Sequence, residues 1–130
     1  MALGEMALEE SAVNIPLKTI TANGIHMRYA EMGPKESRAP LVLFCHGWPE
    51  SWYSWRHQLA AVSAAGFRCV APDMRGYGGT EAPDGADQYT LMHLVGDMAE
   101  LVKALGETKA IIVGHDWGAP VAWQDRKSVV

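Results

Sequence analysis

Two kinds of apolar pattern alternate along the chain. Short unbroken apolar runs occupy residues 41–45, 68–72 and 110–113, and such runs are typical of strands covered on both faces of a parallel sheet. Two longer segments, residues 52–62 and 91–105, repeat their apolar residues every three or four positions, as amphipathic helices do. Strands that alternate with helices predict a three-layer α/β/α fold, with helices on both faces of a mostly parallel sheet.

A β-hairpin is expected ahead of this alternation. Residues 17–21 and 25–29 have a strand-like composition, and Ala22-Asn23-Gly24 lies between them. The Asn-Gly pair favours a tight turn, because both residues tolerate positive φ. Residues 1–14 show no periodicity and are predicted to form a flexible leader, which leaves residues 15–130 as a single domain.

Both predicted helices have recognisable ends. Ser51 and Thr90 stand immediately before them, and each hydroxyl can cap a first turn. Gly66 and Gly106 follow them, and glycine commonly ends a helix because it adopts positive φ without strain. The predicted apolar face of the second helix comprises Leu91, Leu94, Val95, Met98, Leu101, Val102 and Leu105.

Composition and charge narrow the possible partners. The chain has 130 residues, a formal net charge of −4 and no cluster of Lys and Arg, which argues against nucleic acid or an anionic membrane. No apolar stretch is long enough to span a membrane, and the start lacks the basic region of a signal peptide. Cys45 and Cys69 lie within apolar runs, which predicts two unreactive core thiols in a reducing cytoplasm.

Neither a cofactor nor a metal is expected. The segment at residues 76–81 resembles a phosphate-binding loop only superficially, since it lacks the Lys of a P-loop and has Glu81 where a dinucleotide-binding motif needs its third Gly. The His, Cys and Asp residues show no spacing that suits a metal ion. Asp73 and Arg75 are instead predicted to fix the loop by hydrogen bonding to each other.

The first candidate for chemistry follows the apolar run at residues 110–113. Gly114-His115-Asp116-Trp117-Gly118 links this predicted strand to a predicted helix, and Gly-x-nucleophile-x-Gly at such a junction is a nucleophile elbow. Asp116 would sit at the N-terminal end of the helix, where unpaired N–H groups keep a carboxylate ionised and ready to attack. The alternative is a tight turn in which Asp116 only caps the helix.

A second motif favours the catalytic interpretation. His46-Gly47-Trp48-Pro49 directly follows the run at residues 41–45, and parallel α/β sheets bind ligands at the carboxyl ends of their strands. In this architecture an N–H of that loop and the N–H after the nucleophile form an oxyanion hole. The peptide bond before Pro49 is either cis or part of an ordinary surface turn.

From about residue 17 to Trp123 the chain resembles the epoxide hydrolases of the α/β-hydrolase fold. The resemblance rests on three motifs in order, at residues 46–56, 73–78 and 114–118. Haloalkane dehalogenases share the Asp nucleophile followed by Trp, but they usually have Asn where Trp48 stands. The sequence therefore favours an epoxide hydrolase, with a fragment of a haloalkane dehalogenase-like hydrolase as the less favoured alternative.

The resemblance implies a two-step hydrolysis of a small apolar epoxide to a vicinal diol. Asp116 would attack an epoxide carbon and form an ester, and the backbone N–H groups of Trp48 and Trp117 would stabilise the oxyanion when water hydrolyses that ester. His46 and His115 are expected to be buried or hydrogen-bonded parts of the scaffold rather than bases. The resemblance gives a structural role to the other matching positions of the two motifs, which are His46, Gly47, Pro49, Gly114, His115 and Gly118.

The acid–base half of the family mechanism has no counterpart in this sequence. In the family, two tyrosines of a helical cap protonate the ring oxygen and a histidine backed by an acidic residue activates water, all downstream of the elbow. Here every histidine lies at or before His115, and the tail after Trp123 departs from the expected apolar helix. The sequence predicts the N-terminal half of an α/β-hydrolase fold that is catalytically incomplete. The alternative is a truncated form that acts by binding a partner.

The resemblance also predicts a surface for self-association. In the family's strand order the strand at residues 110–113 is central, with the strand at residues 41–45 as one neighbour. The neighbour on its other side is missing from the sequence. The apolar edge left open could pair with other chains.

Overall fold

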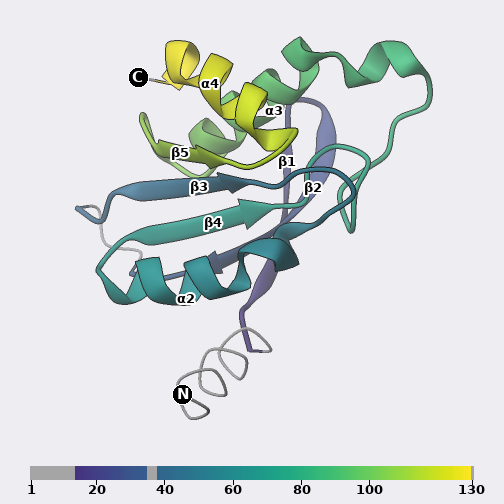
Figure 1. Cartoon of the computed structure of the whole chain (residues 1–130). Coiled ribbons are helices and arrows are strands. Elements are labelled where there is room, and N and C mark those ends of the chain that lie inside the picture. Colours follow the sequence, from purple (N-terminus) through teal and green to yellow (C-terminus); the bar gives the residue numbers. More distant parts are fainter. Residues whose placement is uncertain (1–13, 35–37, 130) are drawn as a thin grey trace.

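The computed structural model describes residues 14–34 and 38–129, with side chains described up to Asp125 (Figure 1). Residues 1–13 of the predicted leader lie outside the described residues. The strands are β1 (Leu17–Ala22), β2 (Ile25–Met32), β3 (Leu41–Cys45), β4 (Arg68–Pro72) and β5 (Ile111–Gly114). The helices are the 3₁₀ turns η1 (Trp52–Trp55) and η2 (Ala86–Tyr89) and the α-helices α2 (Arg56–Ala64), α3 (Leu91–Ala104) and α4 (Gly118–Val129).

The strands form one mixed sheet in the order β1-β2-β4-β3-β5. β3 runs parallel to both β4 and β5, whereas the N-terminal hairpin joins the sheet through antiparallel pairing of β2 with β4. In Figure 1, α2 covers one face of the sheet and α3 and α4 cover the other. The predicted class is confirmed: an α/β/α arrangement with a parallel part that follows a hairpin.

The hairpin turn is the one that the Asn-Gly pair predicts. Asn23 and Gly24 have φ values of 52° and 78°, and the flanking residues pair across a two-residue loop. β2 extends to Met32, beyond the predicted end, because its last residues pair with β4. The hairpin is thus fixed to the sheet through its second strand.

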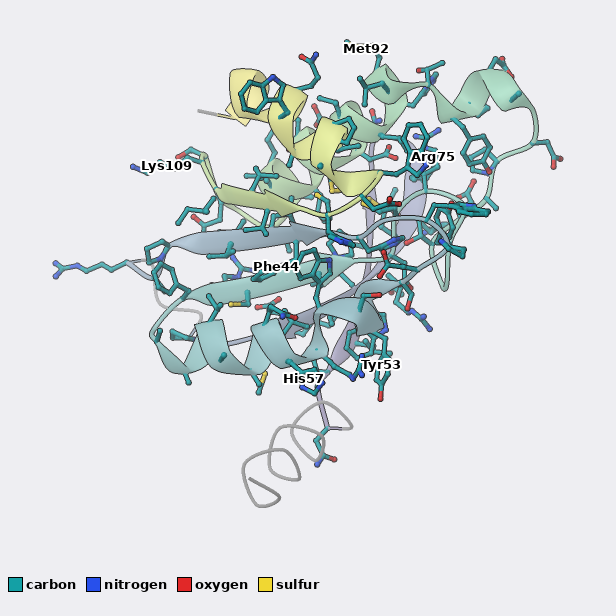
Figure 2. All side chains as sticks on the ribbon, in the orientation of Figure 1. Phe44, Tyr53, His57, Arg75, Met92 and Lys109 are labelled. Carbon is teal, nitrogen blue, oxygen red and sulfur yellow. The ribbon has the colours of Figure 1, made fainter. Side chains whose placement is uncertain are left out.

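Alternate residues of the strands enter two separate apolar clusters. Leu43 and Val70 face α3, where Leu101 packs in the same cluster. Val42 and Phe44 belong to the cluster on the α2 side, and Figure 2 shows Phe44 between the sheet and that helix. This two-residue period is that of strands buried on both faces.

The two cysteines lie on opposite faces of the sheet. Cys45 belongs to the α3 side and Cys69 to the α2 side, and both are free and fully buried. Burial raises the pKa of both thiols, that of Cys69 to about 11. Thiols that stay protonated at neutral pH are poor nucleophiles, so the structure supports unreactive core cysteines.

The helices differ from the predicted ones in detail. The first begins as a 3₁₀ turn, where the Ser51 hydroxyl accepts a hydrogen bond from the Tyr53 N–H. The short turn η2, directly before α3, has no counterpart among the predicted helices. Thr90 caps α3 by accepting from the His93 N–H, as its position predicts. Leu91 is exposed rather than part of the apolar face, because burial along α3 begins at Val95, one turn later.

The prediction that β5 is covered on both faces is wrong. Ile111 is 51% exposed, and no residue of the strand is fully buried. Within the described part of the chain, β5 pairs only with β3 and packs against α4. One edge of the strand therefore carries no partner among the described residues.

Asp73 and Arg75 do not bond to each other, contrary to prediction. The buried Asp73 carboxylate accepts from Arg28 Nε at 2.8 Å and from the Trp52 N–H at 2.9 Å. Arg75 makes a two-point contact with Asp97 of α3, at 2.8 and 2.7 Å. The loop after β4 is consequently tied to β2, η1 and α3, which are distant in sequence.

A buried carboxylate lies in α4. Val121 and Asp125 both have no exposed surface, yet neither carboxylate oxygen of Asp125 has a hydrogen-bond partner among the described residues. Burial raises the pKa of Asp125 from 3.8 to about 6. Ionisation of Asp125 therefore opposes the packing of α4.

We expect the contribution of Asp125 to the stability of the chain to fall as the pH rises from 4 to 7. Below pH 3.8 Asp125 is protonated in both the folded and unfolded states, and above about pH 6 the full cost of burying its charge is present. Asp125→Leu should raise the free energy of unfolding by about 1–3 kcal/mol at pH 7.5 and by less at pH 4. Urea unfolding at both pH values measures this difference, with the exposed Asp84→Leu as control. Equal effects at the two pH values would contradict the prediction.

Candidate active site

The turn between β5 and α4 has the geometry of a nucleophile elbow. Asp116 has a φ of 56°, a left-handed conformation that is uncommon for residues other than glycine. The Gly118 N–H donates to the His115 carbonyl at 2.9 Å, which closes the turn. The strand and the helix meet sharply here, so the Asp116 side chain projects from the top of the turn.

Close backbone contacts explain the glycines around Asp116. A Cβ on Gly118 would collide with the carbonyl of Cys45 at the end of β3, and a Cβ on Gly114 would collide with the carbonyl of Gly118. A Cβ on Gly47 would lie 2.8 Å from Asp116 Oδ2. Side chains at these positions would push apart the parts of the chain that form the site.

The loop after β3 donates a hydrogen bond to the Asp116 carboxylate. The N–H of Trp48 lies 3.0 Å from Asp116 Oδ2. Hydrogen bonds from the backbone N–H groups of Trp48 and Trp117 hold the pKa of Asp116 below its ordinary value, with a smaller contribution from the nearby His115. The carboxylate is therefore ionised at neutral pH, with one oxygen held against the Trp48 donor. The Trp48–Pro49 peptide is cis, which is one of the two alternatives that the sequence leaves open.

His46 is buried, and both of its ring nitrogens are engaged. The Met74 N–H can only donate, so Nε2, 2.8 Å away, accepts its hydrogen bond and Nδ1 carries the ring proton. Nδ1 donates this proton to the Gly47 carbonyl at 2.8 Å. Burial lowers the pKa of His46, which keeps the ring neutral. The ring has no free nitrogen with which to accept a proton from water.

His115 differs from this picture. Its backbone N–H donates to the Cys45 carbonyl at 3.2 Å, and its side chain is 71% exposed, so of the two alternatives, buried or hydrogen-bonded, His115 fits the second. The ring lies beside Glu50, with 3.6 Å between Nδ1 and Oε1. A hydrogen bond with Ser54, helped by His115, lowers the pKa of Glu50.

Glu50 is a site residue that the sequence did not single out. Its Oε1, like Asp116 Oδ2, lies 2.8 Å from the position that a Cβ on Gly47 would occupy. Two carboxylates therefore flank Gly47. The sequence could have indicated that Glu50 lies at the site, because Glu50 directly follows the His46-Gly47-Trp48-Pro49 motif.

A cavity of about 240 Å³ opens beside the elbow. Most of its lining is apolar or aromatic, and the exposed Trp48 and Trp117 stand at its rim. Burial and the charge of Asp116 raise the pKa of Tyr77, so this phenol stays protonated next to the site. Sequence reasoning missed most of the wall. The lining residues are His46, Gly47, Trp48, Met74, Arg75, Tyr77, Tyr89, Leu94 and Trp117.

The described residues show neither a metal-binding cluster nor a membrane-spanning helix. They contain no cluster of three or more His, Cys, Asp or Glu side chains placed to bind a metal ion. None of the helices described is both long and apolar enough to cross a membrane.

Comparison with known proteins identifies the family. The profile of the α/β hydrolase fold matches residues 40–124. The chain belongs to the α/β-hydrolase fold family. Epoxide hydrolase 2 of Siraitia grosvenorii is 51% identical over 105 residues, which cover 81% of this chain and 32% of that protein. Epoxide hydrolase A of Mycobacterium tuberculosis is 43% identical over 106 residues, 82% of this chain and 32% of that protein.

Solved structures of this α/β-hydrolase family agree with the sequence comparison. The crystal structure of epoxide hydrolase VrEH1 from Vigna radiata superposes with a TM-score of 0.85 at 50% identity, and the match covers 92% of this chain and 39% of that one. An epoxide hydrolase from an endophytic Streptomyces gives a TM-score of 0.82 at 44% identity, with 88% of this chain and 34% of that one covered. The resemblance to epoxide hydrolases is confirmed. The chain spans about a third of the length of these curated relatives.

We expect Gly118→Ala to be far more costly than an alanine at an open glycine. The new methyl would overlap the backbone carbonyl of Cys45, which cannot move without shifting β3. Urea unfolding should show a loss of about 3 kcal/mol or more. The control, Gly66→Ala, has a φ of 99° but nothing within 4 Å of its Cβ, and should lose only about 1–2 kcal/mol. Similar losses for the two variants would show that the contact between α4 and β3 is not tight.

Proposed function

We propose that the chain forms the nucleophile half of an epoxide hydrolase, with Asp116 as the nucleophile. The observation that carries this proposal is the ionised Asp116 carboxylate at a left-handed elbow, 3.0 Å from the Trp48 N–H. Relatives named as epoxide hydrolases support the choice of reaction. Trp48, where dehalogenases usually have Asn, supports an epoxide rather than a haloalkane as substrate.

The proposed first step is an attack of Asp116 on a ring carbon of the epoxide. The carboxylate oxygen forms a bond to that carbon, the ring C–O bond breaks, and the ring oxygen takes a proton from solvent. The product of this step is a hydroxyalkyl ester of Asp116. The mostly apolar cavity beside the elbow supports a small apolar epoxide as the substrate class.

The proposed second step is hydrolysis of this ester. Water adds to the ester carbonyl and loses one proton to solvent, so that the carbonyl oxygen becomes an oxyanion beside the N–H groups of Trp48 and Trp117. Collapse of this intermediate breaks the bond between the carbonyl carbon and the diol oxygen. The diol oxygen takes the remaining proton of the added water, which releases a vicinal diol and restores the Asp116 carboxylate. The scaffold roles of Gly47, Pro49, Gly114 and Gly118 belong to the same proposal.

In the described part of the chain, neither histidine at the site has the position of a base for the second step. Both ring nitrogens of His46 are engaged, and the ring of His115 is exposed beside Glu50. His26, His57 and His93 belong to other parts of the fold. We therefore propose that the 130-residue chain forms the ester but does not turn over efficiently.

A second candidate function is association through the sheet edge. β5 exposes Ile111 and has no partner on its outer side among the described residues. The exposed Trp117 and Trp123 follow it in the elbow and in α4. This surface supports a non-catalytic role in which the chain pairs with another copy of itself.

The reaction proposal is tested with styrene oxide and peptide mass spectrometry. We expect one adduct, on Asp116, and no steady-state diol formation, because general base catalysis typically contributes about 10²–10⁴-fold to the rate. Asp116→Asn should carry no adduct. Sustained diol formation that Asp116→Asn abolishes would contradict the incomplete mechanism. Labels spread evenly over Glu81, Asp84, Asp87 and Asp116 would contradict an organised nucleophile.

The association proposal is tested by light scattering. We expect the chain to form dimers or larger species, and Ile111→Lys to shift it toward monomer, because a charge on an open edge opposes strand pairing. Leu17→Lys, on the opposite edge of the sheet, is the matched control and should not alter the assembly. A monodisperse monomer that unfolds cooperatively and binds no hydrophobic dye would rule out this function.

A further inference from the structure

The peptide group between Gly47 and Trp48 is held at both of its polar atoms. Its carbonyl, from Gly47, accepts from His46 Nδ1 at 2.8 Å and from the Glu50 N–H at 3.1 Å. Its N–H, from Trp48, donates to Asp116 Oδ2 at 3.0 Å. In a planar trans peptide the C=O and N–H point in opposite directions, so a bond that fixes the carbonyl also sets the direction of the N–H.

His46 is itself fixed from the neighbouring strand. The Met74 N–H donates to its Nε2 at 2.8 Å, and Met74 directly follows Asp73, whose own N–H donates to the Arg28 carbonyl of β2. The ring is 3% exposed and packs edge-on against Tyr77, with 5.2 Å between ring centroids. The imidazole is therefore an ordered link between the loop after β4 and the loop after β3.

We propose that His46 is a positioning residue for the oxyanion donor: its neutral, Nδ1-protonated ring holds the Gly47–Trp48 peptide so that the Trp48 N–H points at Asp116. The importance of this link for catalysis rests on the proposed role of Asp116. The coupling between the His46 and Asp116 side chains does not depend on that role, because it follows from the hydrogen bonds alone. A line of three hydrogen bonds then runs from Met74 through His46 and the peptide to the Asp116 carboxylate.

The protonation state of the ring is an essential part of the link. A proton on Nε2 would face the Met74 N–H, two donors with no acceptor between them. Burial disfavours the charged ring, with protons on both nitrogens, by lowering the pKa of His46, although the Gly47 carbonyl and the charges of Asp73 and Glu50 act in the other direction. The neutral ring with its proton on Nδ1 is the form that satisfies both neighbours.

Two substitutions separate the two hydrogen bonds of the ring. In His46→Asn the side-chain amide N–H can take the place of Nδ1–H, which keeps the donor to Gly47 but loses the acceptor for Met74. In His46→Gln the longer side chain can take the place of Nε2, which keeps the acceptor but loses the donor. If His46 only stabilises the fold, the two variants should affect Asp116 to a similar extent. If His46 positions the Trp48 N–H, the variant that loses the donor to Gly47 should affect Asp116 more.

The readout is the pKa of Asp116, because the Trp48 N–H is the largest cause of its lowering. The carboxyl carbon is followed by NMR in chain labelled with ¹³C-aspartate, and Asp116→Asn assigns the signal. We expect His46→Gln to raise the pKa by about one unit, a tenfold weaker acid, and His46→Asn to leave it within about 0.3 unit of the parent. Equal shifts, no shift, or a larger shift in His46→Asn would overturn the proposal.

A measurement on the parent chain covers the case in which a variant fails to fold. The ¹⁵N shifts of the His46 ring, in solution or in the solid state if the chain assembles, should show a neutral ring protonated on Nδ1 at pH 7. A proton on Nε2, or a charged ring, would overturn the proposal. Neither measurement uses an epoxide, so an unreactive Asp116 would contradict the proposed function and leave this inference standing.

Discussion

The contact between Gly118 and the carbonyl of Cys45 sets the geometry on which the site depends. It places the first turn of α4 directly against the carboxyl end of β3. β3 continues without interruption into the loop that carries Trp48, while the elbow that carries Asp116 leads into α4. The close approach of Gly118 to Cys45 therefore brings the Trp48 N–H and the Asp116 carboxylate within 3.0 Å of each other. The absence of a side chain at position 118 allows this approach.

Buried charges hold the rest of the site in place. The Arg75–Asp97 pair is almost fully buried, and the Asp73 carboxylate collects donors from β2 and η1. Such pairs gain little net stability, because desolvation offsets their attraction, but a buried charge that loses its partner is strongly destabilising. Their effect here is to specify one position for the loop after β4, and thereby for the imidazole of His46.

Local patterns made most of the fold predictable. The Asn23-Gly24 turn and the Thr90 cap depend on residues close in sequence, and the structure forms both. The elbow was equally visible, since the motif around Asp116 requires only a strand before it and a helix after it. The sequence could not reveal that Asp73 bonds Arg28 rather than Arg75, because that choice depends on how distant strands come together.

Exposure was harder to predict than secondary structure. An apolar run indicates that its residues favour burial, but it does not indicate whether another element packs over them. Ile111 is exposed for this reason. The cavity wall was missed because Met74 and Leu94 come from separate elements that meet only in the fold. The hydrogen-bonded link through His46 could be recognised only from atomic positions, because the sequence motif does not indicate which ring nitrogen carries the proton.

The strand order gives the sheet two unlike ends. At one end β1 presents Lys18, Thr19 and Thr21, and at the other β5 presents a short apolar strand. If two copies paired through β5, the open apolar edge of each copy would be covered by the other. The combined ten-stranded sheet would have a polar β1 at each end. In such a dimer, growth by this contact would stop at two copies, whereas a sheet with two apolar ends could extend into a filament. The hairpin would then limit the size of the proposed assembly.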